Sequence, residues 1–596
     1  MYKWFFQVAM WLAALALPMA GMGASTETES NTFDGYTLVA PNFHTTTYLI
    51  DMDGNVVHYW LNDGTPALSA YLLENGNLLR TSTVAQQEQT PGAQGAPRGR
   101  GFGGGMPGGM GGMADRGGGA GGRIQEIDWE GNVVWEFRFE NDDHITHHDV
   151  EIMPNGHILC IAWERKTTRE AIDAGRDPAF QGSADLRPDF IIEVKPDKVN
   201  NGGEIVWQWH AWDHLIQDFD KDKANYGEVA AHPELIDVNF TANRTVAPSG
   251  AAAGPARGGF GGMGGFGGAP GRMGGGMTMM GLTGAGGTMP PDWMHTNAID
   301  YNADLDQIAI SCYGFSEIWI IDHSTTTEEA RGHTGGKQGK GGDLIYRWGN
   351  PRAYRAGTEA DQKFFNQHDV HWIPEGRPGA GHLLVFNNGP YRPDGDYSSV
   401  DEIVTPVDAN GHYPLDKGTS YGPVDAVWSY AAPNKSDFFS MHISGAERQP
   451  NGNTLICSGA YGVFFEVTPD KEVVWRCAYT GGDSPEGPDL TSGMGGMGGF
   501  GMPNRAGGFG GGGRGGFPGM PGAGGAQPTA TAELPRFAVT REDPAVSGLQ
   551  GMPASLPKWG GGTGFGVTDT QTFRVYRYPA DYPGLTGKKL IPIDKE

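Results

Sequence analysis

The stretch HDVEIMPNGHILCIAW at His148–Trp163 consists of two short apolar runs joined by a Pro-Asn-Gly turn. Val, Ile and Trp are frequent in both runs, and such runs bounded by turn residues are typical of β-strands. Two similar runs follow and complete a unit of four predicted strands, at residues 148–153, 157–162, 190–194 and 204–209.

The last strand of this unit carries a tryptophan, and the same signature recurs along the chain. Its six copies are Val56–Trp60, Val133–Trp135, Ile205–Trp207, Leu344–Trp348, Val427–Trp428 and Val473–Trp475. Six four-stranded units predict an all-β fold, a six-bladed β-propeller. A pair of β-sandwiches is the alternative, and it fits the spacing of the units less well.

The predicted propeller domain covers residues 33–590 and closes on itself. The chain opens with three strands at 36–40, 48–52 and 55–60, and the C-terminal run Thr572–Tyr578 can supply the fourth. Closure removes the exposed edges that an open array of sheets would leave. The segment Trp212–Asn239 departs from the strand pattern and predicts a short helical excursion, with His232-Pro233-Glu234 opening a turn of helix.

Three segments are rich in glycine and methionine, at residues 91–123, 250–290 and 493–528. Chain of this composition loses too much conformational entropy on ordering to form a core. We therefore expect flexible insertions, and the blade topology predicts that all three surround one mouth of the central channel.

Residues 1–24 combine Lys3, a short apolar run and small residues, which is typical of a secretory signal peptide. The run is too short for a membrane span, so we expect a periplasmic or secreted protein without a stable span after cleavage. A net charge of −26 argues against a nucleic-acid partner. The four cysteines lie in strand-like runs, have no metal-ligand spacing and are expected to be buried free thiols.

Histidines recur at the start of the first predicted strand of four units. His148 and His368 begin His-Asp-Val motifs, while His295 and His442 lie in Met-His-Thr-Asn and Met-His-Ile-Ser. First strands border the channel of a propeller, so these imidazoles should converge at one channel mouth. Aligning the units adds Asn297 and Ser444 to this cluster, because residues two apart on a strand share one side.

Asp149 and Asp369 follow two of these histidines and should point to the opposite side of the strand, where we expect them to bond backbone groups. Two chemistries suit the histidine cluster itself. Neutral imidazoles could bind a transition metal, or one could act as a nucleophile while the others donate hydrogen bonds to an anionic group. No carboxylate or cysteine is clearly aimed there to complete a metal site. Gly332–Gly342 lacks the phosphate-loop pattern, and no Gly-x-Ser-x-Gly elbow is present.

At these motifs the chain resembles the bacterial aryl-sulfate sulfotransferases, propeller enzymes that use no nucleotide sulfate donor. The similarity runs from about residue 35 to 585 outside the glycine-rich segments. The matching stretches are Thr146–Val150, Asp292–Asn297, Glu317–Asp322, Gln367–Val370 and Tyr576–Pro579.

The resemblance implies sulfuryl transfer from a small phenolic sulfate ester to a phenol through a sulfohistidine, with no cofactor and no metal. His368 would be the nucleophile, and His148, His295 and Asn297 would steady the sulfuryl oxygens or protonate the leaving phenolate. Substrate contacts would come from His442, Ser444, Tyr313 and Arg448.

The chain departs from the family at one position. The family places an arginine in the strand after the Asn297 motif, whereas this chain has Tyr313, which supplies neither the charge nor the fork of a guanidinium. Arg448, or Arg352 and Arg355, could compensate; otherwise the donor differs or activity is lost. Two rival functions remain open: a metal-dependent propeller hydrolase or lyase that uses the same histidines, and a non-catalytic propeller that binds envelope polymers.

Overall fold

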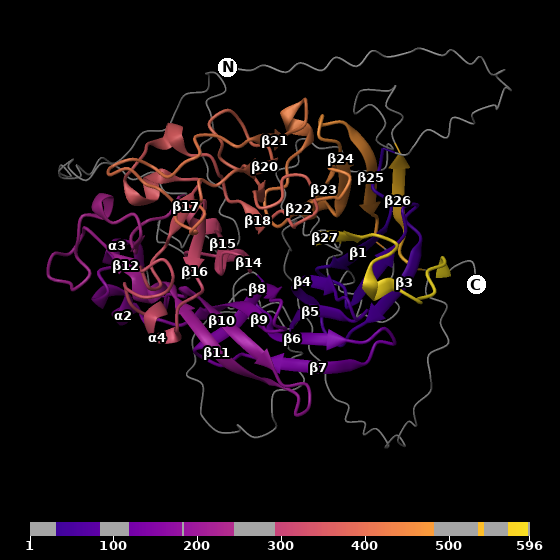
Figure 1. The fold of residues 1–596 in the computed structure, drawn as a ribbon, viewed down its shortest axis with the longest axis horizontal. Helices are drawn as coiled ribbons and strands as arrows, with labels where there is room; N and C mark the ends of the chain where they lie inside the picture. The colour runs from indigo at the N-terminus through magenta and orange to yellow at the C-terminus, as the bar shows by residue number, and fades with distance from the viewer. Residues whose placement is uncertain are drawn as a thin grey trace, which may run out of the picture. The chain divides into compact units, whose positions relative to one another are not determined.

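The computed structural model describes residues 31–83, 119–181, 184–242, 292–481, 534–541 and 570–593. Six antiparallel sheets of four or five strands stand in a ring, which confirms the six-bladed β-propeller (Figure 1). Among the described residues, no helix is long and apolar enough to cross a membrane. All four cysteines are free and buried, as expected.

The blades are numbered in chain order, and in each the first-named strand is innermost. Blade 1 comprises β4 (Pro66–Leu72), β5 (Leu78–Thr83), β6 (Gly122–Ile127) and β7 (Val133–Arg138). Blade 2 comprises β8 (His144–Ile152), β9 (Ile158–Glu164), β10 (Asp189–Pro196) and β11 (Gly203–His210). Blade 3 comprises β14 (Thr296–Asn302), β15 (Gln307–Cys312), β16 (Glu317–Asp322) and β17 (Tyr346–Trp348).

Blade 4 comprises β18 (His368–Trp372), β19 (Leu383–Asn387), β20 (Ser399–Ile403) and β21 (Trp428–Tyr430). Blade 5 comprises β22 (Gly445–Arg448), β23 (Thr454–Ser458), β24 (Val463–Val467) and β25 (Val473–Tyr479), with β26 (Phe537–Arg541) as an unpredicted fifth strand. Blade 6 comprises β27 (Thr572–Tyr578), β1 (Tyr36–Pro41), β2 (Thr46–Ile50) and β3 (Val56–Leu61).

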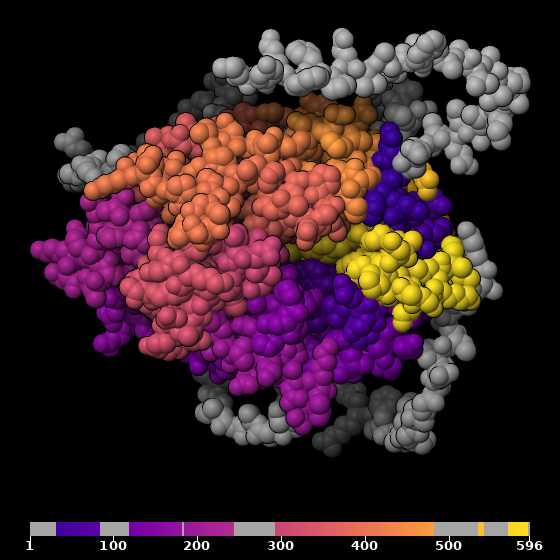
Figure 2. Space-filling model, in the orientation of Figure 1, coloured from indigo at the N-terminus to yellow at the C-terminus, as the bar shows by residue number. Residues whose placement is uncertain are grey.

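Blade 6 confirms the predicted closure. Its innermost strand β27 comes from the C-terminal end of the fold and pairs antiparallel with β1, Tyr36 opposite Tyr578. The Tyr578 hydroxyl also accepts a hydrogen bond from the Leu72 amide of blade 1, at 2.9 Å. Figure 2 shows the C-terminal segment in yellow against the indigo N-terminal strands. The first and last parts of the fold are therefore joined in one sheet.

The recurring tryptophans hold each blade to the next. In every blade an outer-strand indole N–H donates to a backbone carbonyl in the connection between the third and fourth strands of the following blade. The six bonds are Trp60 to Asp128 O, Trp135 to Gly202 O, Trp209 to Gly342 O, Trp348 to Pro423 O, Trp428 to Pro469 O and Trp475 to Met52 O, all 2.7–3.0 Å. In blade 2, Trp209 makes the equivalent bond, while Trp207 of the signature donates to Thr325 Oγ1 at 3.3 Å.

We expect Trp475→Phe to lower the free energy of unfolding by about 2–3 kcal/mol, of which about 1 kcal/mol is the usual net value of one hydrogen bond and the rest is the cost of the cavity that the smaller ring leaves. Trp475 is fully buried, and the Met52 carbonyl loses its donor. Urea denaturation of both proteins measures the difference. Trp428→Phe is the matched comparison, because Trp428 is only partly buried and should change stability less. An unchanged midpoint for Trp475→Phe would mean that the indole bond does not stabilise the closure.

The predicted helical excursion at Trp212–Asn239 is confirmed in part, because its helical turns are 3-10 rather than α. It consists of two short 3-10 turns, η2 (Ala211–His214) and η3 (Val229–Ala231), and two parallel two-residue strands, β12 (Leu215–Ile216) and β13 (Ile236–Asp237). His232 is the C-cap of η3, and Pro233 and Glu234 form a turn that does not continue into a helix. The α-helices lie elsewhere: α2 (Thr168–Asp173), α3 (Pro178–Gln181) and α4 (Thr327–Ala330).

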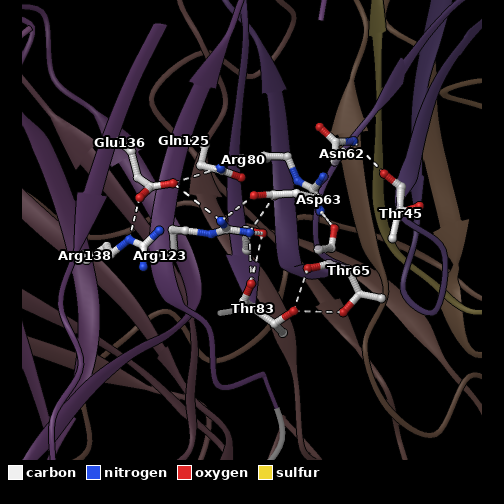
Figure 3. Close-up of polar contacts among 12 residues, drawn as sticks. Thr45, Asn62, Asp63, Thr65, Arg80, Thr83, Arg123, Gln125, Glu136 and Arg138 are labelled. Atoms are coloured by element: carbon white, nitrogen blue, oxygen red, sulfur yellow. Dashed lines mark hydrogen bonds and ion pairs between the residues drawn. The ribbon is translucent and has the colours of Figure 1, made fainter. Parts of the chain in front are cut away.

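The predicted insertion 91–123 extends too far. Its last two residues, Gly122 and Arg123, begin β6, and the buried Arg123 guanidinium binds both carboxylate oxygens of Asp63 at 2.7 Å (Figure 3). Arg123 also donates to Ser82 Oγ at 3.0 Å. This ion pair anchors the link from blade 6 inside blade 1. Residues 91–118 of this insertion, the predicted insertions at 250–290 and 493–528, and the predicted signal peptide at 1–24 lie outside the described residues.

Candidate active site

The inner strands bulge where the histidines stand. Pairing shifts register between Thr146 and Val150 in blade 2, at Asn297 in blade 3, and between His368 and His371 in blade 4. His148 and His295 have positive φ angles of 55° and 51°. Left-handed backbone at non-glycine residues is strained and gathers at functional sites, and bulges re-aim side chains.

Five aromatic side chains from these blades and from β27 form a closed circuit, here named the histidine ring. Its members are His148, His295, Tyr313, His368 and Phe573, from blades 2, 3, 4 and 6. Successive ring centroids lie 4.5, 5.2, 5.4, 6.3 and 6.2 Å apart in that order, with Phe573 closing on His148. All but His295 are buried, and the His295 side chain is 16% exposed.

The tautomer of His368 is set by Asn388. The Asn388 amide nitrogen donates to the Ser440 and Ile443 carbonyls at 2.7 and 2.8 Å, so the amide oxygen must face His368. That oxygen lies 2.7 Å from His368 Nδ1, which therefore carries the ring proton. The lone pair of the neutral imidazole is left on Nε2, the atom that can act as a nucleophile.

His148 is held by a second histidine that the sequence analysis did not single out. Nδ1 of His147 lies 2.7 Å from Nδ1 of His148, and His147 stacks on Trp163 at 4.0 Å. The other side of His148 packs flat against Gly119, where a Cβ atom would lie 2.7 Å from the imidazole. His148 therefore has little freedom to rotate.

The ring histidines differ in charge. Burial and the neighbouring histidines hold the pKa values of His148 and His368 well below the usual range, so both are neutral. Burial also opposes the charged form of His295, but Asp292, whose Oδ2 lies 2.5 Å from Nδ1, raises its pKa. The site thus pairs neutral imidazoles with one whose protonated form is stabilised, an arrangement that suits acid–base chemistry.

Arg574 of β27 forms the floor of the site. Its guanidinium is buried and binds Asp149 Oδ2 at 2.6 Å, Asp369 Oδ1 at 3.0 Å and the Asn297 carbonyl at 2.9 Å. Asp149 and Asp369 also accept from the backbone amides of Val150 and Ala446, as expected. One arginine from blade 6 thereby ties the inner strands of blades 2, 3 and 4 beneath the imidazoles.

Comparison with known proteins gives a family. A family model described as Arylsulfotransferase (ASST) matches residues 24–484, most of the chain. The chain belongs to the arylsulfotransferase family. This confirms the resemblance and supports a sulfotransferase-type enzyme that transfers sulfuryl groups between aryl compounds. None of the curated proteins matches.

Solved structures give distant likenesses to this chain. A protein of unknown function from Bacteroides caccae has a TM-score of 0.35 at 9% identity, over 74% of this chain and 93% of its own. Hydrazine synthase from Kuenenia stuttgartiensis has a TM-score of 0.28 at 13% identity, over 62% and 69%. A functionally unknown protein from Desulfotomaculum acetoxidans has a TM-score of 0.30 at 10% identity, over 74% of this chain and 94% of its own. Likenesses of this size say nothing about activity.

The remaining predicted site residues of the arylsulfotransferase lie around the histidine ring. Asn297 is buried and donates to the Gln367 carbonyl at 2.9 Å, which positions the residue before His368. His442 lies close enough to His368 to lower the pKa of His368, and its buried Nδ1 has no hydrogen-bond partner among the described residues. The Ser444 hydroxyl bonds Ser440 Oγ at 2.8 Å and accepts a hydrogen bond from the Gly459 amide, so both of its contacts lie within the blade 5 region.

The three arginines considered as substitutes for the family arginine lie elsewhere. Arg448 binds Glu402 Oε2 at 2.6 Å and packs over Trp428. Arg355 pairs with Asp237 at 2.8 Å, and Arg352 donates to Gln362. The structure does not bring them to the histidine ring of the arylsulfotransferase.

Sequence reasoning missed His147, Asn388, Phe573 and Arg574. Of these four, only His147 could have been found from the sequence, because it directly precedes His148. At the histidine ring, the described residues do not bring three metal-ligand atoms together. Among the described residues, the single group of three converging metal-ligand atoms is His214, His333 and Asp343, on another part of this arylsulfotransferase.

Proposed function

We propose that this arylsulfotransferase moves a sulfuryl group from a phenolic sulfate ester to a second phenol through a sulfohistidine on Nε2 of His368. The observation that carries the proposal is the Asn388 contact, which puts the proton of His368 on Nδ1 and the lone pair on Nε2. A depressed pKa keeps that lone pair available.

In the first half-reaction, the Nε2 lone pair attacks sulfur and the bond between sulfur and the phenolic oxygen breaks. The departing phenolate takes the proton of the His295 imidazolium. His148 packs edge-on to His295 at 4.5 Å, and by staying neutral it does not repel that charge. Burial raises the pKa of Tyr313, so its hydroxyl keeps its proton as a donor for the sulfuryl oxygens.

In the second half-reaction, the acceptor phenol gives its proton to the now neutral His295. Its oxygen attacks sulfur, the N–S bond breaks, and the electron pair returns to Nε2 of His368. His368 and His295 are then back in their starting protonation states. Transfer of this kind spreads charge over oxygens and depends mainly on positioning and hydrogen-bond donors.

Intact-mass spectrometry tests the intermediate. Full-length protein is exposed briefly to a chromogenic aryl sulfate, alongside His368→Ala, His148→Ala and the matched control His412→Ala, whose imidazole is surface-exposed. A gain of one SO3 unit in all but His368→Ala is the expected result. No adduct and no phenol release with several donors would refute the proposed function.

The pH dependence follows from Asp292. His295 acts as an acid, so the rate should fall as pH rises through its raised pKa. In Asp292→Asn the carboxylate is lost and burial prevails, so the alkaline limb of kcat/KM should move to lower pH. The profile is measured with an aryl sulfate whose phenol is a poor leaving group, because that phenol needs the proton most. An alkaline limb that stays in place would remove His295 from the acid role.

Tyr313→Phe should lower kcat/KM about 100-fold, the usual loss when one donor to a developing anion is removed. The phenyl ring keeps the packing against His295 and His368, so the variant should still fold. Steady-state rates and thermal unfolding are measured together. An unaltered rate would show that Tyr313 serves only as a wall of the ring.

We also propose export to the periplasm or the medium, on the signal-peptide pattern of residues 1–24. Cell fractionation with the mass of the mature N-terminus tests this, and an uncleaved cytoplasmic protein would contradict it.

A further inference from the structure

A second histidine cluster joins blades 2 and 3 at their outer strands. It consists of His214, His333 and Asp343 and is here named the His214 cluster. His214 ends η2, directly after the outermost strand of blade 2, whereas His333 and Asp343 lie in the β16–β17 connection of blade 3. Their ligand atoms all lie within 4.8 Å of one another.

Both imidazoles face the same carboxylate oxygen. Nδ1 of His214 lies 2.8 Å from Asp343 Oδ1, and Nδ1 of His333 lies 2.7 Å from it. His214 and Asp343 are buried, but the His333 side chain is 60% exposed. The cluster is therefore rigid on one side and open to solvent on the other.

The tautomer of His214 makes this contact unusual. Its Nε2 lies 2.9 Å from the Ala330 carbonyl, which can only accept, so Nε2 carries a proton. In the neutral ring, the lone pair of Nδ1 then points at a carboxylate oxygen, so this contact needs either a second proton on Nδ1 or a metal ion. The imidazole of His333 is directed at the same oxygen, and two imidazoles that converge on one carboxylate favour the metal ion. Metal-ligating histidines typically donate their other N–H to a backbone carbonyl in this way.

The surroundings hold His214 in place. The Trp209 ring lies parallel to it, with centroids 5.8 Å apart, and the Trp209 indole donates to the Gly342 carbonyl at 2.7 Å. A Cβ atom at Gly342 would lie 2.6 Å from His214 Nε2 and would overlap the Ala330 carbonyl oxygen. Only glycine therefore lets this connection approach the imidazole. The glycines of Gly332–Gly342, which form no phosphate loop, have a structural use here.

We propose that the His214 cluster binds a divalent first-row transition ion of the zinc class. Nδ1 of His214, Nδ1 of His333 and the Asp343 carboxylate are the ligands, and water completes the coordination. Two imidazoles and one carboxylate form a donor set that suits such ions. Tetrahedral zinc places its ligand atoms about 3.3 Å apart, so the side chains separate by about half an ångström on binding. The exposed His333 has room for that movement, and the ion links blade 2 to blade 3.

Equilibrium dialysis tests the site. Full-length protein stripped with a chelator is dialysed against zinc, and bound zinc is counted by mass spectrometry. We expect one tight zinc per chain in the wild type and in His368→Ala. His333→Ala should weaken binding at least 100-fold, since loss of a second-shell partner alone weakens metal affinity about 10–100-fold.

His412→Ala is the matched control, because its exposed imidazole lies beside Asp408 and is not one of the three converging ligands. It should bind zinc as the wild type does, and zinc should raise the melting temperature of both but not of His333→Ala. Unchanged binding in His333→Ala, or no binding in the wild type, would overturn the proposal and leave a buried ion pair. Loss of zinc in His368→Ala would also overturn it, by moving the metal to the histidine ring.

Discussion

Replacement of His368 by alanine is expected to abolish the sulfuryl adduct and to lower kcat/KM at least about 1,000-fold, because no other group can replace a covalent nucleophile. The side chain is buried against Asn388 and has its Nδ1 proton fixed there. Stopped-flow release of a coloured phenol, followed by mass spectrometry of the same sample, measures both effects.

His148→Ala is the control that shows which of the two histidines is the nucleophile. His148 occupies the equivalent position of blade 2 and is also neutral, but its Nδ1 faces another histidine rather than an amide oxygen. We expect slower turnover with the adduct retained. An adduct present in His368→Ala but absent in His148→Ala would reverse the two roles while keeping the reaction.

Replacement of Arg574 by methionine is expected to lower the free energy of unfolding by about 3–5 kcal/mol, the usual effect of breaking a buried ion pair. Asp149 and Asp369 would be left buried and charged without their cation. Their repulsion would separate inner strands of different blades. Urea and thermal unfolding of the purified variant measure the loss.

Arg541→Ala is the matched control, since the Arg541 pair with Asp53 is exposed and should contribute about 1 kcal/mol or less. The double variant Arg574→Met/Asp149→Asn should recover part of the stability, because one uncompensated charge is removed. Equal, small effects of Arg574→Met and Arg541→Ala would show that the floor does not hold the blades together.

Much of the fold could be predicted because it repeats. A tryptophan in each outer strand and a histidine at several inner strands mark the blades, and the short strand at Thr572–Tyr578 could be recognised as the missing one. The region Trp212–Asn239 could not be predicted in the same way, since it has no counterpart in the other blades. Its backbone follows local contacts, such as the pairing of Leu215 with Ile236.

The candidate site could be predicted in part for the same reason. His148, His295 and His368 come together because their blades are equivalent, but the partners that set their charge, such as Asp292 and Asn388, lie on connections without a repeat. Arg448 was misplaced along its strand. It lies at the far end of β22 from His442, where its guanidinium binds Glu402 and packs over Trp428.

The strand β27 has one more consequence. Phe573 and Arg574 lie in the strand that closes the ring of blades, and they also form a wall and the floor of the histidine ring. Docking of this one strand therefore completes the fold and the candidate site together. A chain in which β27 has not yet paired with β1 holds its histidines without the parts that enclose them.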